Sequence, residues 1–190
     1  MTIITIDGNI GAGKTTILNH LHKYKGFQID LEPIERWKLF LDNIYINKKD
    51  FFNFHIRIWL DRAWIQEKDT KSIIFMERSP YFIRNTFILN DFNNNNINQE
   101  ELNVLNEMYK RTDNIWKSNL HIYLRTTPEK CLSRIKERGR DNEMNISLNY
   151  LQDIHNLHEN AYKNNKSVIM IDINDKTIPE IVDEIISKIK

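Results

Sequence analysis

Short runs of apolar, β-branched residues recur along the chain, and longer amphipathic stretches separate them. Four runs are clear and one is weaker. They are TIITI (2–6), SIIFM (72–76), LHIYL (120–124), SVIMIDI (167–173) and the weaker FQIDL (27–31). Because these runs are continuously apolar rather than alternating, they predict strands that are buried on both faces of a parallel sheet.

The stretches between these runs carry apolar residues at helical spacing. They predict helices at 14–23, 36–43, 51–68, 80–90, 99–112, 128–138, 147–163 and 177–189. Thr127 before Pro128, and Thr177 before Glu180, are typical helix starts. Strands that alternate with helices predict an α/β fold with a doubly wound, five-stranded parallel sheet, which binds ligands at the carboxyl ends of its strands. The asparagine-rich stretch 90–99 is expected to be a solvated loop.

Composition limits the classes of partner. The 190 residues are expected to form one domain, and their 27 basic and 26 acidic side chains give a formal charge of +1. This balance favours neither a polynucleotide nor a membrane surface as partner. The one cysteine, Cys131, excludes an internal disulfide and is expected to be a small buried hydrophobe. No signal segment or membrane-spanning run is visible, so a cytoplasmic protein is expected.

A glycine-rich segment follows the first predicted strand. Residues 8–15 fit the pattern G-x-x-x-x-G-K-[ST] between a strand and a helix, which predicts a P-loop whose backbone N–H groups surround phosphate. Lys14 is expected to reach the β- and γ-phosphates of ATP, and the Thr15 hydroxyl to help hold Mg²⁺. The residues expected to bind the donor phosphates are Gly8, Asn9, Gly11, Ala12, Gly13, Lys14, Thr15 and Thr16. A GTPase switch is disfavoured because the chain has no D-x-x-G segment.

Two further strand ends carry charged residues. Glu32, in LEPIERW, can accept the proton of a hydroxyl that attacks the γ-phosphate. In FMERS, Glu77 is placed to bind Mg²⁺, and Arg78 to reach the hydroxyl or the transferred phosphate. The alternative for Glu32 is an exposed glutamate in a turn, and the alternative for Glu77 and Arg78 is a surface ion pair.

Arginines and aromatic residues mark two more segments. Arg134 and Arg138 lie four residues apart, and Arg140 follows Gly139, so this segment predicts an arginine-rich lid at about 134–145. The alternative is a solvated basic helix face. The aromatic helix at 53–64 is expected to supply core residues, although a flat apolar slot also suits a nucleobase.

Together these segments resemble the deoxynucleoside kinase family. The similar blocks, from Ile6 to Asp175, are DGNIGAGKTT, EPIERW, ERSPY, YLRTTPEKCLSRIKERGRDNE, LNYLQDIHNLHE and IDIND. The resemblance implies a P-loop kinase fold and a homodimer that transfers the γ-phosphate of ATP to the 5′-hydroxyl of a deoxyribonucleoside. Glu32 would be the general base, with Lys14, Arg78 and Arg138 also catalytic.

The resemblance also implies roles for residues around the acceptor. Tyr45 and Glu143 would hold the 3′-hydroxyl, and Phe54 and Phe87 would stack on the base. The remaining assignments are Ile34 and Trp37 to the sugar pocket, Arg62 to the edge of the base, Arg134, Arg138 and Arg140 to the phosphate lid, and Asp172 and Asn174 to the loop around the donor adenine.

Two positions depart from the family pattern. His55 stands where the family usually has glutamine, and a neutral imidazole cannot make the same paired contact to a base. Ile83 stands where some members carry a base-reading aspartate. These departures predict a lenient enzyme or one that prefers pyrimidines.

The nearest alternative is a thymidylate-type nucleoside monophosphate kinase, which shares the phosphate loop but has different blocks after its second and third strands. An anionic acceptor would also lie unfavourably beside Glu32 if no positive charge compensates that carboxylate. A non-catalytic nucleotide switch is the alternative from another class.

Overall fold

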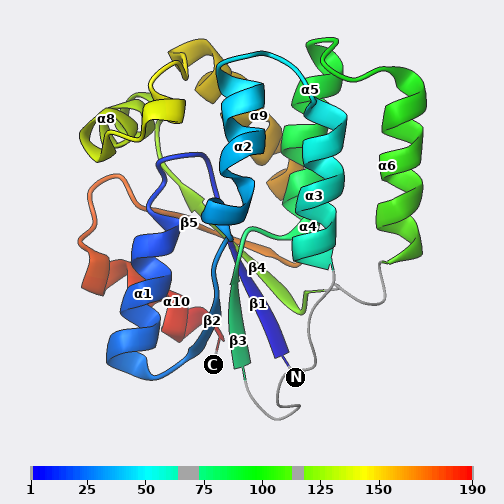
Figure 1. The fold of residues 1–190 in the computed structure, drawn as a ribbon. Helices are drawn as coiled ribbons and strands as arrows, with labels where there is room; N and C mark the ends of the chain where they lie inside the picture. The colour runs from blue at the N-terminus through cyan, green and yellow to red at the C-terminus, as the bar shows by residue number, and fades with distance from the viewer. Residues whose placement is uncertain (1, 64–72, 113–117, 190) are drawn as a thin grey trace.

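Five strands form one parallel sheet in the computed structural model, which describes residues 2–63, 73–112 and 118–189. The strands are β1 (Thr2–Asp7), β2 (Gln28–Asp30), β3 (Ile73–Glu77), β4 (Leu120–Arg125) and β5 (Val168–Asp172). Their order is β2-β3-β1-β4-β5, and every neighbouring pair runs parallel (Figure 1). The prediction of a five-stranded, doubly wound parallel sheet is confirmed.

Helices occupy the predicted stretches between the strands. Their bounds are α1 (Lys14–Lys25), α2 (Ile34–Tyr45), α3 (Phe51–Ala63), α4 (Pro80–Ile83), η1 (Arg84–Ile88), α5 (Leu89–Asn93), α6 (Gln99–Arg111), α8 (Pro128–Arg138), η2 (Asp141–Glu143), α9 (Leu148–Lys163) and α10 (Ile178–Ile189). The last part of the helix predicted at 51–68 lies outside the described residues. Thr127 caps α8 by accepting a hydrogen bond from the Lys130 N–H at 3.3 Å. None of the described helices has the length and apolar character to cross a membrane.

Both faces of the sheet are covered, as the continuously apolar strands require. On one face, Ile6, Leu124 and Ile171 pack with α1 and α10, which lie side by side (Figure 1). On the other face, Tyr123 and Val168 pack against Phe82 of α4 and Ala161 of α9. Successive strand residues point to opposite faces, so each strand contributes to both layers.

A second apolar core joins the helices that lie beyond the sheet. Trp37 of α2, Phe54 of α3, Ile83 of α4 and Leu105 of α6 are buried together in it. Figure 1 shows α2, α3 and α6 in the upper half of the view, away from both chain termini. The strand order reverses at β1, so this helical layer faces the switch point where doubly wound sheets bind ligands.

The segment after β3 differs from its prediction. A single helix was expected at 80–90, but α4 passes through the π-helical turn η1 into α5, which continues to Asn93. The prediction of a solvated loop at 90–99 is therefore wrong at its start, because Asn90 and Asp91 are helical and buried. Residues 93–96 are exposed, as expected.

Cys131 is buried on α8, as predicted. Burial raises the pKa of its thiol to about 11, with smaller opposing effects from Lys14 and Arg134. Because the thiolate is the reactive form, this cysteine is an inert packing residue.

His158 lies fully buried on α9 beside two aromatic rings. Its ring centroid is 5.4 Å from that of Phe82 and 5.5 Å from that of Tyr123. Nδ1 donates to the carbonyl of Ile154 at 2.8 Å, and Nε2 has no hydrogen-bond partner among the described residues. Burial lowers the pKa of His158 to about 3, although the bond to Ile154 opposes that shift.

We expect this histidine to make folding sensitive to acid. The unfolded chain binds a proton at His158 near pH 6.5, whereas the folded protein does so only near pH 3. Stability is therefore lost as the pH falls below about 6.5. Replacing His158→Phe should reduce by roughly 1 kcal/mol the loss of unfolding free energy between pH 7.5 and pH 5.5, as measured by urea denaturation.

The exposed residue His22 of α1 supplies the matched control. A His22→Phe variant should lose as much stability between the two pH values as the unmodified protein. An equal loss in the His158→Phe variant would contradict the assignment.

Candidate functional site

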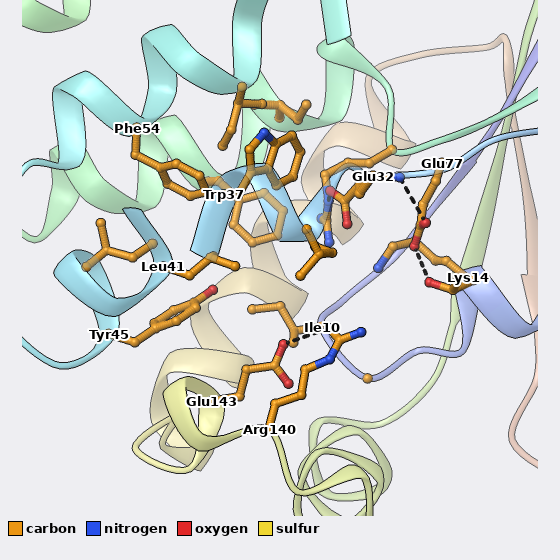
Figure 2. A pocket seen from close by; sticks show the side chains of 18 of the residues that line it. Ile10, Lys14, Glu32, Trp37, Leu41, Tyr45, Phe54, Glu77, Arg140 and Glu143 are labelled. Atoms are coloured by element: carbon orange, nitrogen blue, oxygen red, sulfur yellow. Dashed lines mark hydrogen bonds and ion pairs between the residues drawn. The ribbon is translucent and has the colours of Figure 1, made fainter. Parts of the chain in front are cut away.

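A cavity of about 130 Å³ lies between the phosphate loop, the ends of β2 and β3, and the helical layer (Figure 2). Most residues predicted to form the site line it. They are Gly11, Gly13, Lys14, Thr15, Thr16, Glu32, Ile34, Trp37, Tyr45, Phe54, His55, Glu77, Arg78, Ile83, Phe87, Arg138, Arg140 and Glu143. The predicted site residues that do not line it are Gly8, Asn9, Ala12, Arg62, Arg134, Asp172 and Asn174.

The phosphate loop closes around its own lysine. Lys14 Nζ donates to the carbonyls of Gly8 at 3.2 Å and Asn9 at 3.0 Å. A Cβ atom on Gly11, which has φ +79°, would lie 2.5 Å from the carbonyl oxygen of Cys131, so only glycine fits there. Burial, assisted by the charge of Arg78, lowers the pKa of Lys14 to about 8. The loop therefore holds a cation that anionic phosphate oxygens would stabilise.

A buried ion pair lies beside this loop. Arg78 Nε donates to Glu32 Oε1 at 2.6 Å, and both side chains are about nine-tenths buried. Burial favours the neutral form of Glu32, but Arg78, Lys14 and Arg62 together lower its pKa below the ordinary value. Glu32 is therefore ionised at neutral pH and able to accept a proton.

The backbone and guanidinium of Arg78 are held in an unusual arrangement. Its φ of +61° lies in the left-handed region, which non-glycine residues rarely adopt and which is typical of strained functional sites. The guanidinium carbon lies 4.3 Å from the ring centroid of Phe87. Nη1 is buried and has no partner among the described residues, so this N–H group remains available to a ligand.

Thr15 and Glu77 join the phosphate loop to the end of β3. The Thr15 hydroxyl donates to Glu77 Oε1 at 2.7 Å, and Glu77 Oε2 accepts from the backbone N–H of Glu32 at 3.3 Å. Within residues 2–63, 73–112 and 118–189, no group of three or more His, Cys, Asp or Glu residues is arranged to hold a metal. The two oxygen donors fit Mg²⁺, which takes its other ligands from water and phosphate in nucleotide sites.

The two ends of the cavity differ in character. Figure 2 shows Lys14 and Glu77 at one end, Phe54, Leu41 and Tyr45 at the other, and Glu32 between them. Aromatic and aliphatic walls with a few polar groups are typical of a pocket for a flat ligand. The cavity therefore joins a charged compartment to an apolar one, with the Glu32 carboxylate at the junction.

At the apolar end, His55 is buried against Phe54, with ring centroids 6.4 Å apart. His55 Nε2 is 2.8 Å from Asp91 Oδ2. Tyr45 lies next to Glu143 and is hydrogen-bonded to Tyr150. Burial and the charge of Glu143 raise the pKa of Tyr45, which keeps this phenol protonated.

The arginine-rich segment lies partly at the cavity. Arg138 Nη2 bonds to Glu143 Oε2, and Arg140 Nη1 bonds to Glu143 Oε1 at 3.2 Å. Arg134 is half-buried one turn earlier on α8 and is not part of the cavity wall. Two of the three predicted lid arginines thus meet at one carboxylate.

Arg62, which was expected at the edge of the base, does not line the cavity in this structure. Arg62 is fully buried and donates to the carbonyls of Glu77 at 2.7 Å and Leu31 at 3.2 Å, and to Asp30 at 3.3 Å. It lies two helical turns after Phe54, at the end of α3 where the helix meets the sheet. Its guanidinium therefore joins the ends of β2 and β3 and supports the Glu32 backbone.

The loop expected around the donor adenine is attached to the start of α8. Asn174 Oδ1 accepts from the Thr126 hydroxyl at 2.9 Å, and the Asn174 N–H donates to Asp172 Oδ1 at 3.0 Å. Lys130 Nζ bonds to the carbonyl of Asn174. The loop thus follows β5 and lies outside the cavity wall.

Among the residues that the structure describes, six of the cavity wall were not identified from the sequence: Ile10, Leu41, Ile44, Ile58, Asp91 and Tyr150. Asp91 is the chemically informative one. A signal for it exists, because Ile83, Phe87 and Asp91 recur every four residues and therefore share one helix face. This signal was missed because Asp91 lies at the start of an asparagine-rich stretch that was expected to be a solvated loop.

Known proteins share both the sequence and the fold. The family model described as deoxynucleoside kinase matches residues 4–190. Protein 143R of Invertebrate iridescent virus 6, which carries a provisional kinase name, is 35% identical, with 82% of this chain and 80% of the viral protein covered. Deoxycytidine kinase 2 of Gallus gallus is 30% identical, with 82% and 72% covered.

A solved structure of deoxyadenosine kinase from M. mycoides, with dCMP and dCDP bound, superimposes with a TM-score of 0.84 at 26% identity. The match covers 99% of this chain and 98% of that one. Because the family model extends from the first strand to the last helix, this chain belongs to the deoxynucleoside kinase family.

Proposed function

We propose that the chain transfers the γ-phosphate of ATP to the 5′-hydroxyl of a deoxyribonucleoside, with Glu32 as the general base. The observation that carries this proposal is the position of the Glu32–Arg78 pair, between the phosphate loop and an apolar aromatic compartment. Membership of the deoxynucleoside kinase family supports the reaction and its donor. The geometry of the individual residues supports the roles proposed for them below.

In the reaction, the 5′-oxygen forms a bond to the γ-phosphorus while the bond between that phosphorus and the ADP oxygen breaks. The hydroxyl proton moves to Glu32, whose Oε2 accepts no hydrogen bond from the described residues, whereas Oε1 is held by Arg78. The unpartnered Nη1 of Arg78 can donate to the attacking oxygen or to the transferred phosphate. A positioned base of this kind contributes about 10²- to 10⁴-fold in rate.

The donor phosphates would contact Lys14 and the backbone of the phosphate loop. Thr15 and Glu77 would hold Mg²⁺, which neutralises charge on the β- and γ-phosphates. Arg138 and Arg140, now bonded to Glu143, would contact the phosphates from the segment at 134–145. Arg134 would join them from α8, and Asp172 and Asn174 would border the adenine.

The acceptor would occupy the apolar end of the cavity. Phe54 and Phe87 would stack on the base, with Trp37 and Ile34 along the sugar. Tyr45 would donate to the 3′-hydroxyl and Glu143 would accept from it, because the raised pKa of Tyr45 keeps its proton in place. This arrangement fits a deoxyribonucleoside.

A thymidylate-type nucleoside monophosphate kinase is the alternative that shares the phosphate loop. The electrostatic argument against it weakens, because Glu32 is paired with Arg78 and so would not by itself repel an anionic acceptor. The family match favours the nucleoside. Thymidine monophosphate therefore belongs in the substrate panel.

We expect Glu32→Gln to lower the kcat for deoxynucleoside phosphorylation by about 10²- to 10⁴-fold, because the amide cannot accept the proton. The Kd for ATP should change less than threefold. The measurement is Mg-ATP-dependent turnover of deoxycytidine, deoxyadenosine, thymidine and deoxyguanosine, with thymidine monophosphate alongside.

Glu35→Gln is the matched control, since Glu35 is exposed on α2 three residues after Glu32. Its kcat should equal that of the unmodified protein. Full activity of Glu32→Gln, or turnover of thymidine monophosphate alone, would rule out Glu32 as the base.

The lowered pKa of Lys14 predicts pH-dependent donor binding. In the free protein Lys14 loses its proton near pH 8, whereas bound phosphate anions raise its pKa and keep it charged. The Kd for ATP should therefore increase about tenfold between pH 7 and pH 9. Calorimetry at pH 8.5 in buffers of different ionisation enthalpy should show proton uptake on binding.

A Lys14→Arg variant is the control, because its guanidinium stays charged at pH 9. Its Kd for ATP should change less than twofold over the same range. The absence of proton uptake by the unmodified protein would refute the assignment even if the variant binds poorly.

We further propose a homodimer formed through the helical layer. Leu60 of α3 and Val104 of α6 are 49% and 47% exposed on two helices that pack together. The double substitution Leu60→Glu and Val104→Glu should halve the mass measured by light scattering. Ile178→Glu, at an exposed position on α10, should leave the mass unchanged, and a monomeric unmodified protein would exclude the dimer.

A further inference from the structure

A buried histidine–aspartate pair lies in the wall of the apolar end of the cavity. His55 Nε2 is 2.8 Å from Asp91 Oδ2, and both residues are more than nine-tenths buried. Asn96 fixes the carboxylate from the other side, because its Nδ2 donates to Asp91 Oδ1 at 3.1 Å. The backbone N–H of Asn96 also donates to the Asp91 carbonyl at 2.8 Å.

The hydrogen-bond inventory of this pair assigns its free polar atoms. An ionised carboxylate only accepts hydrogen bonds, so the proton between the two residues belongs to His55 Nε2. In a neutral ring, Nδ1 then carries a lone pair and can only accept. His55 Nδ1 is buried and has no partner among the described residues. Each oxygen of Asp91 keeps one further lone pair.

We infer that His55 and Asp91 form an acceptor-only surface that selects an amino group at carbon 4 of a pyrimidine or carbon 6 of a purine, as in cytosine and adenine, over the oxygen that thymine and guanine carry at the same position. This inference rests on the proposed function, because it concerns the base of the same acceptor. An amino group donates to a carboxylate or to Nδ1, whereas a carbonyl oxygen at the same position meets only lone pairs. The His55–Asp91 pair would thus take the role of the glutamine that the family usually has at the position of His55.

Asp91 acts in two ways within this surface. It offers its own oxygens to the amino group, and it positions the proton of His55 on Nε2. The Asp91→Asn substitution would change both, because the new amide N–H₂ can donate to the base or to Nε2. In the second case the His55 proton moves to Nδ1, and the histidine becomes a donor toward the base.

The test compares substrates that differ at one position. Deoxycytidine and deoxyuridine have the same ring, with an amino group or an oxygen at carbon 4, and deoxyadenosine and deoxyinosine differ in the same way at carbon 6. At pH 8.0, with saturating Mg-ATP, kcat/KM for deoxycytidine should exceed that for deoxyuridine by about tenfold or more. The kcat/KM for deoxyadenosine should exceed that for deoxyinosine by a similar factor.

In the Asp91→Asn variant, the deoxycytidine-to-deoxyuridine ratio of kcat/KM should fall at least about tenfold. His55→Gln should lower the same ratio, because an amide offers both a donor and an acceptor. Asp153→Asn is the matched control, since it removes a carboxylate from an exposed position on α9, and its ratio should not change.

The outcomes separate this inference from the proposed function. If the protein phosphorylates nucleosides but its kcat/KM for deoxyuridine or thymidine equals or exceeds that for deoxycytidine, the acceptor surface is overturned. The proposed kinase reaction would remain intact. Turnover of no nucleoside would refute the reaction itself. If Asp91→Asn does not fold, the ratios of the unmodified protein and of His55→Gln still decide the question.

Discussion

The ion pair between Arg78 and Glu32 is the contact on which the rest of the site depends. It requires the ends of β2 and β3 to lie together, and Arg62 ensures this by bonding to both. It also requires Arg78 to adopt a left-handed backbone conformation. That conformation is held on one side by the bond from the Arg78 N–H to the carbonyl of Ile6 and on the other by Asp7, which accepts from the Ser79 N–H at 2.7 Å. The first strand therefore fixes both the phosphate loop and the Glu32–Arg78 pair that faces it.

Burial makes this pair both costly to break and useful. Removing one partner of a buried ion pair typically costs about 3–5 kcal/mol, because the other charge remains without compensation. The three positive charges around Glu32 keep it ionised inside the protein. Lys14 is affected in the opposite direction, since burial and Arg78 lower its pKa to about 8. A bound phosphate would offset the free-energy cost of keeping Lys14 charged in this buried position. The free site is therefore arranged for an anion that arrives with the donor.

The sequence predicts the sheet and the phosphate loop well because both depend on local signals. Continuous apolar runs indicate strands buried on two faces, and the glycine spacing of residues 8–15 is tied to one backbone path. Arg62 and the contact between His55 and Asp91 could not be placed this way, since Arg62 bonds to Glu77, 15 positions away, and His55 lies 36 positions from Asp91 along the chain. The π-helical turn that contains Phe87 also has no spacing signal of its own. Polar residues that bond between different helices and strands can be placed only after the packing of those elements is known.

The carboxylates in the cavity wall set which neighbouring groups donate and which accept. Glu143 and Asp91 both raise the pKa of Tyr45, after burial, and Asp91 and Tyr45 contribute to raising that of Tyr150. The two phenols therefore keep their protons, while Asp91 holds the His55 proton on Nε2 and leaves Nδ1 as an acceptor. The surface proposed to donate to the sugar and the surface proposed to accept from the base would thus both depend on the charge of Asp91. Replacing this single carboxylate would change the hydrogen-bonding character of both walls, so on our proposal Asp91 would let a chain with histidine in place of the usual glutamine discriminate among bases.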